Sequence, residues 1–326
     1  MNSESRMTIV VPVLNREATL QRTLDSISGQ TARPLSVIIV DNGSTDNSRD
    51  IASRWMSRHK ASDFDITLLD MPEKGVSKAR NLGLREAVTP YIMFFDSDDT
   101  MSPHHVEDIM TEFAADPTLD IVGRDVRLHT INDSTRTLPF ADSDLLFQHI
   151  FYSILSTQRY ALRTSLLRKA GGWNEDATVW TDYELGLRLI VENPKVKRID
   201  REPAVDVYQQ PDSITTDSYS KRDKELMKSF LICNEKLSGN MPLRDLKMLD
   251  LKGIVLAGNL TRAKSPEGRR LLVEILDFAN GPFEKIERYA CYIYTALGGR
   301  GIHRIAYFRH SLKKCLKSHR TCPLSK

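Results

Sequence analysis

Cysteine is scarce in this chain of 326 residues. The four that occur, Cys233, Cys291, Cys315 and Cys322, all lie in the last third and show no C-x-x-C spacing. This pattern indicates neither a zinc site nor a disulfide framework, and we expect the reduced thiols of a cytosolic protein.

Long hydrophobic runs are also missing. The N-terminal apolar run, residues 7–14, is interrupted by Pro12 and is too short for the usual hydrophobic part of a signal peptide. No later window reaches the roughly 18 uncharged apolar residues of a membrane-spanning helix. We therefore expect the protein in the cytoplasm.

Acidic residues are absent from the C-terminal end of the chain. Residues 1–288 hold 38 basic and 43 acidic side chains, whereas residues 289–326 hold 8 basic and no acidic ones. The net charge of +3 therefore comes from the tail, and we expect no nucleic-acid partner for the protein as a whole. With 40% hydrophobic and 27% charged residues, the composition is that of a globular protein.

Short β-rich runs alternate with amphipathic segments in the first part of the chain. The runs are residues 7–14, 35–40, 66–69 and 91–95. This alternation predicts an α/β fold, with a mostly parallel sheet covered by helices on both faces. Ligands of such sheets bind beyond the carboxyl ends of the strands, so we expect the polar residues found there to share one edge. These residues are Asn15, Asp41, Asn42 and Asp96 to Asp99.

The pattern changes to successive helices after about residue 217. Four segments, 224–237, 243–260, 268–279 and 284–297, carry apolar residues at i, i+3 or i+4 spacing. The sequence therefore predicts two domains, an α/β domain over residues 1–216 and a helical region over residues 217–326.

Three carboxylates follow the fourth predicted strand in the run YIMFFDSDDT. Asp96, Asp98 and Asp99 repel one another, and a cation would relieve this repulsion. Carboxylate oxygens suit Mg²⁺ or Mn²⁺. An alternative is that Asp98 or Asp99 caps a helix that begins near Pro103, where negative charge is also favourable. The residues themselves leave both explanations open.

The same run also resembles the D-x-D-x-T signature of haloacid-dehalogenase-type phosphatases, with Asp96 as the nucleophile. That family usually carries its signature on the first strand and has a later motif resembling G-D-x-x-x-D. Here the run follows the fourth strand, and no Gly-Asp dipeptide occurs in the chain. A phosphatase is therefore kept only as an alternative.

Four segments, in order, closely resemble the family 2 glycosyltransferases of GT-A fold: IVVPVLNREATLQRTLDSISGQT, VIIVDNGSTDNS, KGVSKARNLGL and YIMFFDSDD. A fifth, AGGWNEDATVWTDYELGLRL, resembles the segment around the catalytic base of that family, and VYQQPDSIT resembles its closing strand. Each motif alone is weak, but five in register are specific. The resemblance covers roughly residues 7–216.

The resemblance implies a GT-A fold and an inverting, metal-dependent glycosyltransferase. Such an enzyme moves a sugar from a nucleotide-sugar, here a UDP-sugar, to a hydroxyl of a saccharide or lipid-linked oligosaccharide. The resemblance further implies a role in bacterial surface polysaccharide synthesis.

Residues that match the motifs inherit roles from the resemblance. Asp98 would bind the Mn²⁺ or Mg²⁺ that bridges the donor diphosphate, and Asp96 would support the ribose or the metal. Asp182 would be the general base. The other matches to the nucleotide-sugar site are Pro12, Asn15 and Glu17 at its lip, Asp41 and Asn42 at the base and ribose, Arg80 facing the diphosphate, and Ser97.

The sequence departs from the family pattern at three positions. Asn42 stands where a second Asp is more common, Thr181 where the family has Glu, and Gln210 where relatives often have His. These departures leave open a second hypothesis, a catalytically silent member that binds a nucleotide-sugar or serves as a scaffold.

Structural explanations also remain open for single site residues. Asn15 could form a turn or a helix cap, and Asp182 could cap a helix over residues 183–191. Arg80 could form a surface ion pair.

Residues 302–320 predict a basic amphipathic helix. Its apolar stripe consists of Ile302, Ile305, Phe308, Leu312 and Leu316, and most of its cations lie on the opposite side. Such a helix can lie on an anionic membrane surface, which would place the protein on the inner face of the plasma membrane, near a lipid-linked acceptor. It could equally dock on the protein with a solvated basic face.

Overall fold

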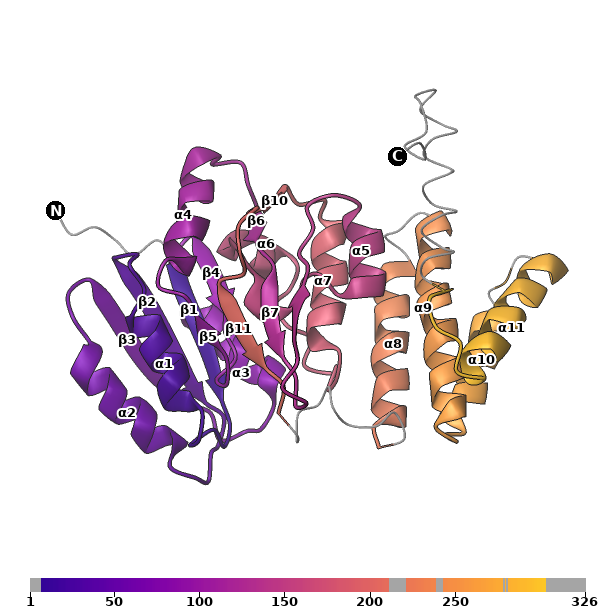
Figure 1. The fold of residues 1–326 in the computed structure, drawn as a ribbon, viewed down its shortest axis with the longest axis horizontal. Coiled ribbons are helices and arrows are strands. Elements are labelled where there is room, and N and C mark those ends of the chain that lie inside the picture. Colours follow the sequence, from indigo (N-terminus) through magenta and orange to yellow (C-terminus); the bar gives the residue numbers. More distant parts are fainter. Residues whose placement is uncertain (1–6, 211–220, 239–242, 278, 280, 303–326) are drawn as a thin grey trace. The chain divides into compact units, whose positions relative to one another are not determined.

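The computed structural model describes residues 7–210, 221–238, 243–277, 279 and 281–302. The chain divides into two compact units, Met1–Thr216 and Asp217–Lys326, which are built from different elements (Figure 1). The first unit is α/β and the second is helical.

A seven-stranded sheet forms the centre of the first unit, in the order β10-β6-β9-β4-β1-β2-β3. The strands are β1 Met7–Val13, β2 Leu35–Asp41, β3 Phe64–Asp70, β4 Tyr91–Phe94, β6 Ile121–Gly123, β9 Tyr160–Arg163 and β10 Val196–Arg198. Strands β4, β1, β2 and β3 are parallel, and β9 is antiparallel to both of its neighbours. The predicted α/β fold with a mostly parallel sheet is therefore confirmed.

Both faces of this sheet are buried, which explains why its strands have continuous apolar sequences. Ile9 and Val11 of β1 pack on one side, in the same core as Trp55, whereas Val10 packs on the other side, in the same core as Trp173. Helices α1 Leu20–Ser28, α2 Ser48–His59 and α4 His105–Ala115 cover the first face. Helices α3 Val76–Glu86, α6 Thr164–Lys169 and α7 Thr181–Val191 cover the second, to which α5 Leu145–Tyr152 adds Leu145.

A small second sheet has the strand order β5-β11-β7-β8. Its first strand, β5, is the next strand after β4 in the sequence. Its strands are β5 Thr100–Met101, β7 Val126–His129, β8 Thr135–Leu138 and β11 Val205–Tyr208. Because β5 begins directly after Asp99, this sheet anchors the far end of the loop that carries the three carboxylates. Residues 96–99 are called the acidic loop below.

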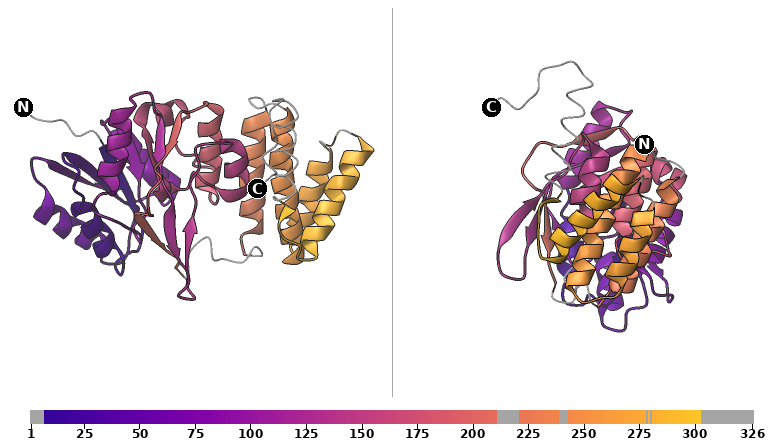
Figure 2. Two further views of the ribbon diagram at one scale, coloured as in Figure 1. Left: turned by 45° about the horizontal axis from the view of Figure 1, so that its top comes forward. Right: turned by 90° about the vertical axis from the view of Figure 1, so that its right-hand side faces the viewer.

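The second unit contains α8 Asp223–Ser238, α9 Leu243–Arg262, α10 Glu267–Asp277 and α11 Pro282–Ala296. The predicted C-terminal helices are confirmed. Helix α9 packs against both α10 and α11 (Figure 2). Gly253 of α9 allows close contact with α8 and α10, because a Cβ there would lie 2.4 Å from Phe230 of α8 and 2.6 Å from Ile275 of α10.

Among the residues described, no helix combines the length and the hydrophobicity needed to cross a membrane. The predicted basic helix at 302–320 lies outside the described residues, apart from Ile302.

Candidate functional site

The carboxyl ends of β1, β2 and β4 meet at one edge of the large sheet. The three strands are neighbours and parallel, with Val13 of β1 paired with Asp41 of β2, and Val10 of β1 paired with Phe94 of β4. Asn15 and the acidic loop follow β1 and β4 directly. The predicted gathering of these polar residues at one sheet edge is therefore confirmed by the strand register.

Protein donors contact each of the three carboxylates of the acidic loop. Asp96 accepts hydrogen bonds from Arg80 Nη2 at 2.9 Å and from Gln158 Nε2 at 2.5 Å. Asp99 is buried and accepts from Gln158 Nε2 at 2.6 Å and from the Tyr208 backbone N–H at 2.9 Å. The side-chain amide of Gln158, from the 3₁₀ turn Thr157–Arg159, therefore bridges two of the three carboxylates.

Asp98 has the weakest protein partner of the three. Its Oδ2 lies 3.6 Å from Arg16 Nε, and its side chain is 17% exposed. Burial, followed by the charge of Asp96, raises the pKa of Asp98 to about 6, against the opposing charge of Arg16. Burial, together with Asp98 and Asp96, also raises the pKa of Asp99 well above its usual value.

The acidic loop does not cap the following helix. Helix α4 begins at His105 and its N-cap is His104, which makes no side-chain capping bond. The Asp99 carboxylate is held instead by Tyr208 and Gln158. The alternative that Asp98 or Asp99 caps this helix is therefore wrong.

Asp182 lies in the first turn of α7, beside the acidic loop. Its Oδ1 accepts hydrogen bonds from Thr157 Oγ1 at 2.8 Å, Arg80 Nη1 at 3.3 Å and Thr181 Oγ1 at 3.4 Å. At Oδ2, the hydrogen bond found within the described residues is a long one of 3.5 Å from the Thr157 backbone N–H. Oδ2 is thus the more available oxygen for an incoming hydroxyl. Helix α7 begins at Thr181 after its N-cap Trp180, so Asp182 is not the cap.

Arg80 connects the acidic loop with Asp182, the predicted general base. Its guanidinium is buried, lies 4.2 Å from the centre of the Trp173 ring and forms ion pairs with Asp96 and Asp182. Burial alone would lower the pKa of Arg80, but the charges of Asp96 and Asp182 outweigh it and raise the pKa. The guanidinium therefore stays charged and brings the two carboxylates together. Its predicted contact with a diphosphate stays a prediction.

Asn15 and Glu17 join the loop after β1 to the loop after β2. Asn15 Oδ1 accepts from the Thr45 backbone N–H at 2.8 Å, and Glu17 Oε2 accepts from Asn47 Nδ2 at 2.9 Å. Asn15 has a φ of 51°, a left-handed conformation that Asn tolerates better than most residues. Pro12 is buried within β1, opposite Val40.

Asp41 and Asn42 are both buried at the end of β2. Asp41 Oδ1 accepts from the Ser44 backbone N–H at 3.3 Å. The Asn42 amide donates to the carbonyl oxygens of Met71 and Glu73 and accepts from the Gly75 backbone N–H. Asn42 thus fixes the loop between β3 and α3, and its reading of a nucleobase stays a prediction.

Two residues of the site lie outside the sequence motifs. Thr157 and Gln158 stand in the segment STQRY, and they reach the carboxylates only because β9 inserts next to β4. Arg22 Nη2 donates to the Asp98 carbonyl at 2.6 Å and covers the Tyr208 ring at 4.1 Å. Ser97, which the sequence did predict, is buried, and its carbonyl accepts from Thr19 Oγ1. Arg16 and Arg22 were not predicted, although both stand in the first motif and could have been considered there.

The donor set fits a divalent cation only in part. Within the described part of the chain, no group of three or more His, Cys, Asp or Glu side chains is arranged to hold a metal ion. Mg²⁺ bound with a nucleotide typically takes one or two carboxylates, and phosphate oxygens and water complete its shell. Asp98 and Asp96, whose side chains are 17% and 33% exposed, meet that requirement. The buried Asp99 does not.

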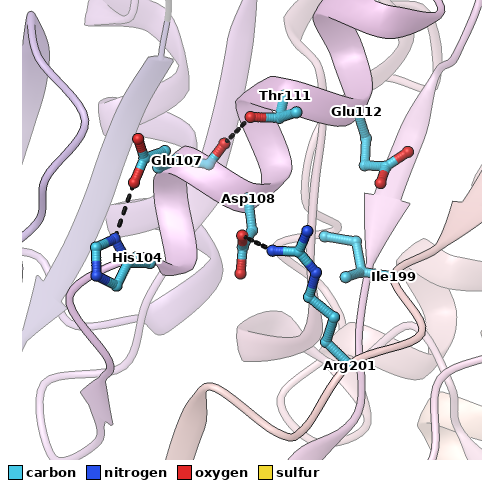
Figure 3. Close-up of a pocket in the computed structure, with 7 residues that line it drawn as sticks. All are labelled: His104, Glu107, Asp108, Thr111, Glu112, Ile199 and Arg201. Carbon is cyan, nitrogen blue, oxygen red and sulfur yellow. Dashed lines mark hydrogen bonds and ion pairs between the residues drawn. The ribbon is translucent and has the colours of Figure 1, made fainter.

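A separate hollow of about 470 Å³ lies over α4 (Figure 3). Glu107 pairs there with His104, and Asp108 pairs with Arg201. The acidic loop and Asp182 do not line it. It is therefore a different feature from the site described above.

The sheet and its acidic edge define a protein of the GT-A class. The structure of S. aureus TarS 1-349 in complex with UDP-GlcNAc has a TM-score of 0.59 at 15% identity, covering 90% of this chain and 92% of that one. The mannosyltransferase PcManGT from Pyrobaculum calidifontis, in complex with GDP-Man and Mn²⁺, has a TM-score of 0.57 at 18% identity, covering 93% and 84%. Both similarities show the fold.

Residues 8–169 match the model of glycosyl transferase family 2, and the chain belongs to this family through its first unit. The uncharacterized glycosyltransferase EpsJ of Bacillus subtilis is 29% identical over 238 residues, which are 69% of this chain and 67% of the relative. The chain spans 16% to 67% of the length of the first curated relatives that it matches. The family resemblance read from the sequence is confirmed, and the phosphatase alternative is not supported.

Proposed function

We propose that the first unit transfers a sugar from a nucleotide-sugar to an acceptor hydroxyl, with inversion at the anomeric carbon. The observation that carries this proposal is the ion-paired Arg80, which holds Asp182 of α7 and Asp96 of the acidic loop on one guanidinium. A general base and a diphosphate-binding loop must lie this close together, because the attacking and leaving oxygens act on the same carbon.

The donor in this proposal is a UDP-sugar. The loops after β1 and β2, joined through Asn15 and Glu17, form the lip of its site, with the buried Asp41 behind them. The similar TarS structure binds UDP-GlcNAc, and the similar PcManGT structure binds GDP-Man. GDP-sugars are therefore the donors to test against UDP-sugars.

Asp98, supported by Asp96, would hold Mn²⁺ or Mg²⁺ together with the donor phosphates. When bound, such a cation neutralises the charge that develops on the departing diphosphate. The partly buried Asp98, whose pKa is raised, has only a long ion pair of 3.6 Å to Arg16 at its carboxylate among the described residues. The cation in PcManGT is Mn²⁺.

Asp182 is the general base in this mechanism. Its Oδ2 accepts the proton of the acceptor hydroxyl as the acceptor oxygen bonds to the anomeric carbon and the bond from that carbon to the phosphate oxygen breaks. Thr157, Thr181 and Arg80 hold Oδ1 and thereby orient the carboxylate. One displacement of this kind inverts the configuration.

For the acceptor, we propose a saccharide or a lipid-linked oligosaccharide of bacterial surface polysaccharide synthesis, used at the inner face of the plasma membrane. This part of the proposal rests on the motif resemblance and on the basic C-terminal sequence. The specificity for the acceptor depends on the shape of the side chains around the acceptor pocket, and the spacing of the motifs does not predict that shape.

The test combines donor binding and turnover. Thermal shift with UDP- and GDP-sugars, with and without Mn²⁺, reports binding, and release of nucleoside diphosphate with saccharide acceptors reports transfer. We expect Asp182→Asn to keep the donor shift and to lose at least about 100-fold in turnover. We expect Asp98→Ala to lose the Mn²⁺-dependent part of the donor shift.

The matched control is Asp176→Asn, an exposed Asp close to Asp182 in the sequence, which should turn over like the wild type. Equal turnover by the wild type, Asp182→Asn and Asp98→Ala would contradict the mechanism. A second candidate, a silent donor-binding member, is favoured by the ion pair that restrains Asp182. It predicts donor binding by the wild type without turnover on any acceptor.

A further inference from the structure

Polar side chains of helix α11 face the other helices of the second unit. Arg288 is buried and donates to Asp250 at 2.6 Å and to the Ile275 carbonyl, and Tyr292 shares a hydrogen bond of 3.0 Å with Thr261. The inner side of α11 is therefore held by an ion pair and hydrogen bonds. This is the reverse of an ordinary surface helix, whose apolar side faces the core.

The opposite side of α11 is an exposed apolar stripe. Phe283 is 88% exposed, Ile286 67% and Leu297 83%, and Tyr289 and Ile293 are also exposed. These five residues follow one another at intervals of 3, 3, 4 and 4, so they lie along one side of the helix and its C-terminal end. They are called the α11 stripe below.

A stripe of this kind differs from the single exposed apolar residues that are normal on protein surfaces. An apolar side along a whole helix exposes a contiguous patch, and such patches mark contacts with proteins or membranes. The polar inner side rules out a simple rotation of the helix to bury the stripe, because Arg288 would then lose Asp250. The stripe therefore needs an occupant from outside the second unit's core.

The charge of the surrounding sequence selects the occupant. From residue 283, where the stripe begins, to the end, the chain carries 10 basic and 2 acidic residues, and the exposed Lys285 and Arg300 flank the stripe. A second copy of the chain would add a second C-terminal sequence of the same basic composition, and like charges repel. An anionic surface with an apolar interior satisfies both the charge and the stripe.

We propose that the α11 stripe docks on the surface of an anionic lipid membrane. Phe283, Ile286 and Leu297 enter the boundary between headgroups and acyl chains, and the Tyr289 ring lies at headgroup level. The basic residues that follow add electrostatic attraction, which salt weakens. This inference does not depend on the proposed sugar transfer, and its residues are separate from the predicted helix at 302–320.

Flotation of the full chain with lipid vesicles tests the proposal. The vesicles are phosphatidylcholine alone or phosphatidylcholine with phosphatidylglycerol. We expect binding to the anionic vesicles, weaker binding in high salt, and a partition coefficient at least about tenfold lower for the double variant Phe283→Gln/Ile286→Gln. Gln leaves the net charge unchanged and is a good helix former, so far-UV circular dichroism should not change.

The matched control is Val88→Gln, which removes a 92% exposed apolar side chain from the first unit and should bind vesicles like the wild type. No binding of the wild type to anionic vesicles would overturn the proposal, as would equal binding by the double variant. A lipid-free dimer that the double variant converts to a monomer would instead assign the stripe to a second copy. A wild-type monomer that binds anionic vesicles only after deletion of residues 303–326 would assign it to the chain's own tail.

Discussion

Gln158 is the residue on which the geometry of the acidic loop depends most directly. Its side-chain nitrogen donates to Asp96 at 2.5 Å and to Asp99 at 2.6 Å. Two carboxylates this close would repel each other, and the amide separates them while satisfying both. Among the described residues, the buried Asp99 would keep the Tyr208 backbone N–H as its one remaining donor if Gln158 were lost. The amide therefore stabilises the loop without adding a charge.

Gln158→Leu should lower the free energy of unfolding by about 1 to 3 kcal/mol, because it leaves buried carboxylate oxygens without a donor. Urea unfolding followed by tryptophan fluorescence measures the loss. Gln21→Leu is the control, since its hydrogen bond to Asp25 is exposed, and it should change stability by less than about 0.5 kcal/mol. Equal effects of the two substitutions would contradict the role given to Gln158.

At the scale of elements, the close approach of α3 to β1 sets the position of Arg80. Gly83 lies one turn beyond Arg80 on α3, and a Cβ there would lie 2.3 Å from Val10 Cγ1. Val10 is fully buried and cannot move away without disturbing the core around it. A glycine at this place thus lets α3 sit low enough on the sheet for its guanidinium to reach both Asp96 and Asp182.

Gly83→Ala should destabilise the first unit by about 1 to 3 kcal/mol through overpacking, although Ala favours a helix more than Gly does. The control is Gly29→Ala at the end of α1, where a Cβ would lie no closer than 3.3 Å to another atom and φ is −74°. We expect Gly29→Ala to be close to neutral. A stabilising effect of Gly83→Ala in urea unfolding would show that α3 does not pack so tightly.

At the scale of the whole molecule, a buried His affects stability toward acid. His105 is fully buried on α4, and neither ring nitrogen has a hydrogen-bond partner within the described residues. Burial, and then the charge of Arg124, lower the pKa of His105 to about 3. In the unfolded chain its pKa is about 6.5, so between these values the unfolded state binds more protons. The stability that His105 contributes is present above pH 6.5 and is lost as the pH falls toward 3.

His105→Leu should reduce the pH dependence of unfolding between pH 6.5 and 3 by about 1 kcal/mol per pH unit. Tryptophan fluorescence is the suitable signal, because all three tryptophans, Trp55, Trp173 and Trp180, belong to the first unit. Carboxylates titrate in the same range in both proteins, so the difference between them isolates the His. Parallel curves for the variant and the wild type would contradict a lowered pKa.

The sequence by itself determined the parallel strands, their order of appearance, the helical C-terminal region and the acidic loop. These features follow from local patterns, since continuous apolar runs predict buried strands and 3.6-residue spacing predicts helices. The motif spacing was also enough to recognise the family, because the motifs stand at the ends of consecutive strands.

Only the tertiary structure decided what each carboxylate contacts. Gln158 and the Tyr208 backbone donate hydrogen bonds to Asp99. Arg80 forms ion pairs with both Asp182 and Asp96. These contacts form because β9 and α7 return to the sheet edge from far along the chain. The apolar outer side of α11 had likewise to be seen in the fold. Helical periodicity shows that a helix has two sides, but which side faces the protein depends on the partners of Arg288, which are distant in sequence.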